Sequence, residues 1–90
     1  MGKLSKRIRA TEGNISEIPN QSGAYLLYRK DGDPYVGSAG AGNLQKRVQQ
    51  QLNTKRGVTS FRYKPTPSEQ EARKWEAKYR DQYNPKQKNI

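Results

Sequence analysis

Apolar and polar positions change places over short distances along this chain, and the first clear pattern lies in residues 24–29. This segment is rich in aromatic and aliphatic side chains, which is typical of a β-strand. Turn-forming residues occupy 31–33, and extended character resumes over residues 34–38. The two extended segments on either side of a turn predict a β-hairpin.

Residues 58–63 carry the alternation expected of a third strand. Phe61 and Tyr63 fall on one face of an extended chain, and the polar residues between them fall on the other. Nearer the N-terminus, residues 3–10 contain two apolar side chains at i, i+4 within a basic segment. That spacing predicts a short basic helix there.

Two further helices are predicted from stronger patterns. Over residues 43–52, apolar side chains recur at i, i+4 and i+8 behind Asn43, a residue that favours helix N-caps. The longer helix is predicted over residues 67–83, because a serine, a proline and two glutamates mark its start and Asn84-Pro85 ends it. Together these elements predict an α+β fold with a small, three-stranded, mainly antiparallel sheet flanked by helices.

The charge of the chain predicts its class of partner. Ninety residues suit a single domain, and eighteen Lys and Arg against eight Asp and Glu give a formal net charge of +10. We expect a polyanionic partner, because the release of counterions from phosphates drives the association of basic proteins with nucleic acid. Membrane binding is not expected, since no helical segment combines a basic face with exposed large apolar side chains.

The residue types that are absent limit the chemistry. The chain has no cysteine and no histidine, which excludes disulfides, thiolate catalysis, zinc ribbons and histidine bases. Any catalysis must use carboxylate, tyrosine, lysine or arginine. No apolar run approaches the roughly 20 residues of a membrane span, so a cytoplasmic location is the default expectation.

Glu76 stands out on the predicted last helix. At 100° per residue it falls inside the apolar stripe of that helix, which comprises Ala72, Trp75, Tyr79 and Tyr83. A partly buried carboxylate needs a cation. Arg73 or Arg80 at helical spacing, or an arginine across the sheet, would meet that need structurally, and a functional site would meet it with a bound cation.

Two further features point to phosphate chemistry only in combination. The predicted hairpin brings together Tyr25, Tyr28 and Tyr35, although each of them alone is read as a half-buried sheet residue. Between Gly37 and Arg47 the chain has small residues followed by a helix start, which is a weak phosphate-binding signal. Arg47 alone is read as a solvated helix charge.

The motifs, taken in order, resemble the GIY-YIG nuclease family over residues 18–89, which leaves residues 1–17 as a basic N-terminal extension. They are Gly23-Ala24-Tyr25, Tyr35-Val36-Gly37, Asn43-Leu44-Gln45-Lys46-Arg47, and Glu76 followed by Tyr83-Asn84-Pro85. The chain departs from the family at Gln51, where a tyrosine or histidine is frequent. The family's C-terminal asparagine matches neither Asn84 nor Asn89 in position.

The resemblance implies a magnesium-dependent endonuclease, with manganese as a substitute metal. Glu76 would hold the metal, and Arg47 would stabilise negative charge on the scissile phosphate. Tyr35 would accept or relay the proton of the attacking water, and Tyr25 would position water or phosphate. DNA is favoured over RNA as the substrate. Further contacts to nucleic acid are expected from Ser38, Lys46, Lys55, Arg56, Arg62 and Lys64.

Two alternatives remain at the level of sequence: a noncatalytic nucleic-acid-binding protein with the same fold, and a catalytic module that acts only within a larger assembly. The register of the hairpin decides whether Tyr25 and Tyr35 can belong to one site. A two-residue turn at residues 31–32 would place Tyr25 and Tyr35 on opposite faces of the sheet. An odd-length loop through residues 31–33 would place them on one face. We predict the odd-length loop, because a shared site requires it.

Overall fold

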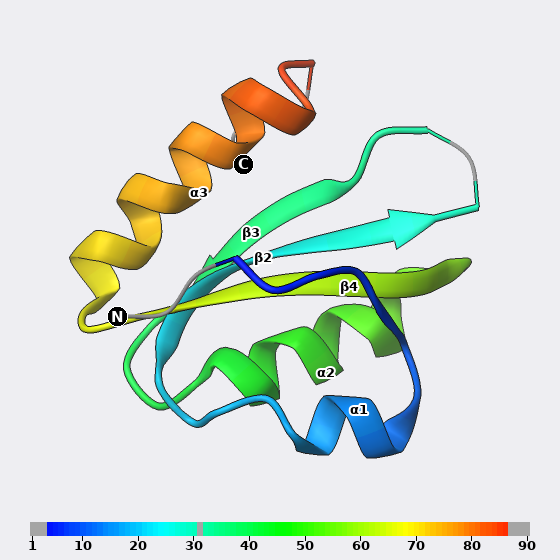
Figure 1. The fold of residues 1–90 in the computed structure, drawn as a ribbon, viewed down its shortest axis with the longest axis horizontal. Helices are drawn as coiled ribbons and strands as arrows, with labels where there is room; N and C mark the ends of the chain where they lie inside the picture. The colour runs from blue at the N-terminus through cyan, green and yellow to red at the C-terminus, as the bar shows by residue number, and fades with distance from the viewer. Residues whose placement is uncertain (1–3, 31, 87–90) are drawn as a thin grey trace.

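The protein has an α+β fold, seen here in a computed structural model that describes residues 4–30 and 32–86 (Figure 1). A four-stranded antiparallel sheet has the strand order β1-β4-β2-β3, and helices cover both of its faces. In chain order the elements are β1 (Ile8–Arg9), α1 (Glu12–Ser16), β2 (Ser22–Arg29), β3 (Tyr35–Ala39), α2 (Leu44–Thr54), β4 (Val58–Thr66) and α3 (Glu69–Tyr83).

The sheet has one strand more than the sequence predicted, and the predicted helix over residues 3–10 is wrong in its described part. Ile8 and Arg9 pair with Phe61 and Ser60 of β4. A helix this short is marginal in isolation, whereas the free edge of β4 offers backbone partners for an extended chain. The next helix, α1, was not predicted, and it begins where the Thr11 hydroxyl accepts from the backbone N–H of Asn14.

The hairpin has the predicted odd-length register. Tyr25 lies opposite Gly37, and Leu27 lies opposite Tyr35. Residues two apart on a strand point to the same face, so Tyr25 and Tyr35 share one face of the sheet. This prediction is confirmed, because a two-residue turn would have placed them on opposite faces.

The longest helix begins two residues later than predicted. Ser68 is its N-cap, and its hydroxyl accepts from the backbone N–H of Glu71 at 3.2 Å. Pro67 therefore lies outside α3, although the sequence placed it at the first helical position. The predicted end of α3 is confirmed at Tyr83, and Asn84 follows as its C-cap.

Both faces of the sheet are buried, which explains the unbroken apolar run in β2. On the face covered by α1 and α2, Leu27 and Phe61 pack with Leu44 and Val48. On the face covered by α3, a second cluster contains Ala24, Leu26, Val36 and Tyr79. A functional site must therefore lie at an edge of the sheet or on the outer surface of a helix. None of the helices in the described ranges is both long and apolar enough to cross a membrane.

Candidate active site

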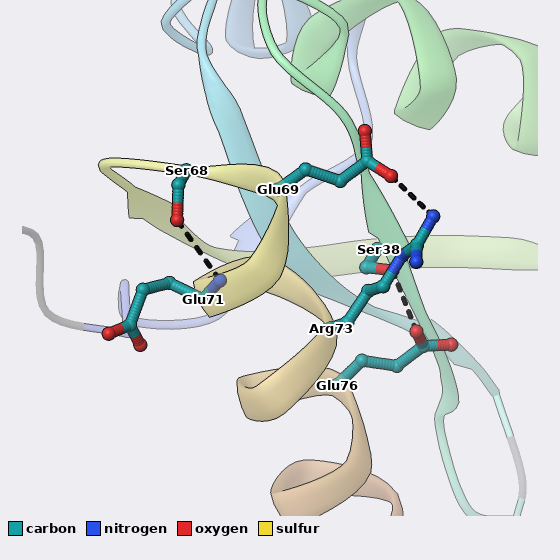
Figure 2. A network of polar contacts seen from close by, with 6 residues as sticks. All are labelled: Ser38, Ser68, Glu69, Glu71, Arg73 and Glu76. Carbon is teal, nitrogen blue, oxygen red and sulfur yellow. Dashed lines mark hydrogen bonds and ion pairs between the residues drawn. The ribbon is translucent and has the colours of Figure 1, made fainter.

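The edge strand β3 brings the helix carboxylate into contact with the hairpin. The Ser38 hydroxyl donates to Glu76 Oε1 at 2.7 Å (Figure 2). The second oxygen of Glu76, Oε2, lies 3.6 Å from Arg80 Nη1. Because the Glu76 side chain keeps 24% exposure, this carboxylate is held in place without being removed from solvent.

The structure shows which cation pairs with the Glu76 carboxylate in the apolar stripe of α3. Of the two arginines at helical spacing, Arg80 takes the carboxylate, and Arg73 instead pairs with Glu69 in the first turn (Figure 2). Packing of α3 directs Glu76 to β3, because Ala72 and Tyr79 on the same side of the helix are buried. The stripe is therefore a mixed surface, apolar over β2 and polar where it meets the edge strand.

Tyr25 reaches the same edge from the opposite face of the sheet. Its side chain is only 2% exposed and lies across Gly37 of the neighbouring strand. A Cβ atom at Gly37 would lie 2.4 Å from the Tyr25 hydroxyl, so the absence of a side chain at this position leaves room for the phenol. Gly37 thus lets a buried tyrosine extend across the last strand of the sheet.

The electrostatics of Tyr25 link three other candidate residues. Burial raises the pKa of the Tyr25 hydroxyl far above its ordinary value, nearby Tyr35 and Glu76 raise it further, and Arg47 lowers it. Tyr25 therefore remains a neutral hydrogen-bond donor at physiological pH. Since charge interactions weaken with distance, Tyr35, Arg47 and Glu76 all lie near enough to Tyr25 to affect its ionisation.

Tyr35 begins β3 and is half-buried at one end of this edge. The ammonium of Lys55, which follows α2, lies 3.9 Å from the centroid of its ring. Beside it, Asn84 Nδ2 donates to the carbonyl oxygen of Pro34 at 2.9 Å and ties the end of α3 to the start of β3. Asn84 thus has a clear positioning role, while Asn89 lies outside the described residues.

Arg47 lies at the other end of the edge, exposed on the first turns of α2. It lines a pocket of about 260 Å³ together with Ser38, Arg73 and Glu69, the ion-pair partner of Arg73. The loop before α2 runs close to α3 here, since a Cβ at Gly40 would lie 2.7 Å from Glu69 Oε1. Arg73 was not predicted as a site residue, because its spacing from Glu69 gives no sign that it faces Arg47 from another helix.

The remaining predicted nucleic-acid contacts lie in three places. Lys46 shares a pocket with Arg47, and Lys55 lies at Tyr35, so both belong to this edge. Arg56 is exposed in the turn after α2. Arg62 and Lys64 lie on β4, separated from β3 by β2, where Arg62 Nε donates to the Ser5 carbonyl and Lys64 Nζ lies 4.3 Å from the Trp75 ring centroid.

The donor atoms at this edge suit a hard divalent cation that keeps most of its waters. Within the described ranges, no three His, Cys, Asp or Glu side chains gather into a metal-binding group. Glu76 instead offers a single carboxylate, with the Ser38 hydroxyl bonded to it and Tyr25 within its electrostatic influence. Magnesium is commonly held by one or two carboxylates and water, so these oxygen donors fit it.

Comparison with known proteins identifies no relative: no protein-family model, curated protein or solved structure matches the chain. The functional assignment therefore depends on the side chains of the chain itself. At the β3 edge these are two tyrosines, a partly exposed carboxylate and a set of arginines and lysines. This combination can bind a phosphodiester and hold a proton donor and an acceptor beside it.

Proposed function

We propose that this protein is a metal-dependent endonuclease of the GIY-YIG type that hydrolyses phosphodiester bonds in DNA. One arrangement at the β3 edge carries the proposal. Ser38 bonds Glu76 and shares a pocket with Arg47, Tyr25 extends across the neighbouring Gly37, and Tyr35 begins the same strand. A purely structural edge strand has no need for such a group. A net charge of +10 adds the general attraction for a polyanion.

In this proposal the scissile phosphate lies against the β3 edge, between the two helices. Arg47 and Arg73 line the pocket at one end, where guanidinium groups can bind phosphate oxygens in pairs and stabilise the charge that develops during cleavage. Tyr25 stays protonated and donates a hydrogen bond to water or phosphate. Tyr35 accepts or relays the proton of the attacking water.

Glu76 is the residue that would hold the magnesium ion, with manganese as a substitute. When bound, the cation offsets negative charge on the phosphate and on the leaving oxygen. Ser38 acts through Glu76, because its hydroxyl fixes one carboxylate oxygen and leaves the other facing Arg80. Ser38 is therefore a positioning residue in this scheme, where the sequence had suggested a direct contact to nucleic acid.

A second candidate function, a noncatalytic nucleic-acid-binding protein, is favoured by one specific observation. Both carboxylate oxygens of Glu76 already have a partner in the protein, so a structural role for this residue needs no metal. The endonuclease remains the better proposal, because a structural role for Glu76 does not account for Tyr25 reaching the same edge across Gly37.

The test is the conversion of supercoiled plasmid and of branched DNA by the full chain in magnesium, manganese or EDTA. We expect cleavage in both metals and none in EDTA. Tyr35→Phe should lose roughly 100-fold to 10,000-fold in rate, the range typical of a lost proton-transfer group. Tyr83→Phe, a matched change on the α3 face, should cleave as the wild type does. Binding without cleavage in every metal would favour the noncatalytic alternative.

A further inference from the structure

A pocket of about 370 Å³ opens beside Tyr35, at the opposite end of β3 from Arg47. Three segments that are distant in sequence contribute a cation to its lining: Arg29 from the end of β2, Lys55 after α2, and Lys86 after α3. No acidic side chain is among the described residues that line it. Three positive charges around one concavity favour an anionic ligand.

Apart from Asn84, the rest of the lining is apolar or aromatic. Leu27 and Val58 line the pocket together with Tyr35, and Asn84 closes it near the end of α3. The hydrogen bond from Asn84 to Pro34 ties this wall to the residue before β3. A ligand that fits here has an anionic part for the cations and a flat or apolar part for Leu27, Val58 and the tyrosine ring.

The size of the pocket separates two anionic ligands. A lone phosphate would leave most of a 370 Å³ space unfilled and would make no use of its apolar lining. A nucleotide has both parts, and the volume lies in the range of small-molecule sites. Stacking of bases on aromatic rings is the usual way in which proteins hold single-stranded nucleic acid.

We propose that this pocket takes one unpaired nucleotide of the substrate, next to the phosphate that is cut. Its phosphate lies among Arg29, Lys55 and Lys86, and its base or sugar lies against Leu27 and Val58. The inference rests on the proposed nuclease function and adds a substrate class to it. A paired base must leave the stack to enter a pocket, so DNA with an unpaired nucleotide at the cleavage point is the preferred substrate.

The first experiment measures binding without cleavage. Thymidine 3′,5′-bisphosphate is titrated into the full chain without metal, and backbone amide resonances are followed by NMR. We expect saturable shifts centred on Leu27, Arg29, Tyr35, Lys55 and Val58. Arg29→Gln and Lys55→Gln should each weaken binding about fivefold to tenfold, the cost of one phosphate contact. Lys74→Gln, an exposed cation elsewhere on α3, should bind as the wild type does.

Two results of this titration would overturn the inference. One is the absence of shifts in the pocket at millimolar bisphosphate. The other is an equal response to inorganic phosphate at the same concentration, because the base and sugar would then contribute nothing.

The second experiment compares cleavage of two duplexes of one sequence, fully paired or with one unpaired nucleotide at the cleavage point. We expect a preference of about tenfold or more for the unpaired nucleotide, which falls in Arg29→Gln and Lys55→Gln but persists in Lys74→Gln. Equal cleavage of both duplexes by the wild type would overturn the inference and leave the nuclease standing. Pocket binding of the bisphosphate with no cleavage of any DNA would refute the nuclease and support a nucleotide site.

Discussion

Among single residues, Gly37 has a direct influence on the candidate site, because its missing side chain is the space that the Tyr25 phenol occupies. We expect Gly37→Ala to destabilise the protein by about 1–3 kcal/mol, since the new Cβ would lie 2.4 Å from the Tyr25 hydroxyl in a packed sheet. Urea unfolding followed by circular dichroism measures this. The matched change is Gly13→Ala, where no described atom lies within 4 Å. It should be neutral or stabilising, and equal destabilisation of both variants would contradict this role of Gly37.

Tyr25 also gives a pH-dependent prediction. Its pKa is raised in the folded state, chiefly by burial, so the folded state resists ionisation of this phenol. The resulting stability is fully present below the unfolded pKa near ~10 and is lost as pH rises toward the folded pKa. We expect Tyr25→Phe to flatten the fall in unfolding free energy between about pH 9 and pH 11. Parallel profiles for the wild type and the variant would show that Tyr25 ionises freely.

For single residues, the sequence predicted that the Glu76 carboxylate lies in an apolar stripe, but it did not predict which side chains contact it. The helical wheel showed a carboxylate in an apolar stripe and two arginines within helical reach of it, Arg73 three residues before Glu76 and Arg80 four residues after it. Only the structure selects Arg80, because the first turn supplies Glu69 to Arg73. The Ser38 contact depends on strand pairing and helix docking, which the spacing of residues in the sequence does not specify.

At the scale of elements, the two well-marked helices differ in how they begin. Ser68 caps α3 through its hydroxyl, whereas Asn43 occupies the N-cap position of α2 without a side-chain capping hydrogen bond among the described residues. We expect Ser68→Ala to cost about 1 kcal/mol of stability and Asn43→Ala a few tenths at most. Thermal unfolding of the two variants measures the difference. A larger loss in Asn43→Ala would contradict these cap assignments.

The elements that the sequence predicted are those with a clear period or a marked boundary. The hairpin, α2, β4 and α3 all have one, and the structure contains each of them, with bounds shifted by a few residues. The missed elements are β1 and α1. A two-residue strand has no period to detect, and its extended form depends on the edge of β4, which is made by residues far along the chain.

At the scale of the whole molecule, strand order determines where a site can form. Helices occupy both faces of the sheet, and β3 lies at the edge because β4 pairs with β2 on the other side. The sequence predicted three strands without their order, so it could not place Tyr25, Ser38 and Glu76 at one edge. The expectation that these residues share a site came only from the resemblance to a known family.

The net charge likewise predicts a class of partner without locating the contacts. Several cations are used by the fold on the α3 face, where Arg7 lies 4.3 Å from the Tyr28 ring centroid and Lys64 and Lys78 lie beside Trp75. Others, such as Arg47 and Lys55, lie at the β3 edge. The total of +10 therefore overstates the number of positive side chains available to nucleic acid at the candidate site.

The assignment of Glu76 to cleavage is tested by following binding and cleavage of one branched DNA in the same samples. The variants are Glu76→Gln and Asp81→Asn, which each remove one negative charge from α3, the second at an exposed position. We expect Glu76→Gln to bind the DNA as tightly as the wild type or more tightly while cleavage in magnesium falls at least about 100-fold, and Asp81→Asn to do both normally. Cleavage by Glu76→Gln at the rate of Asp81→Asn would contradict the account.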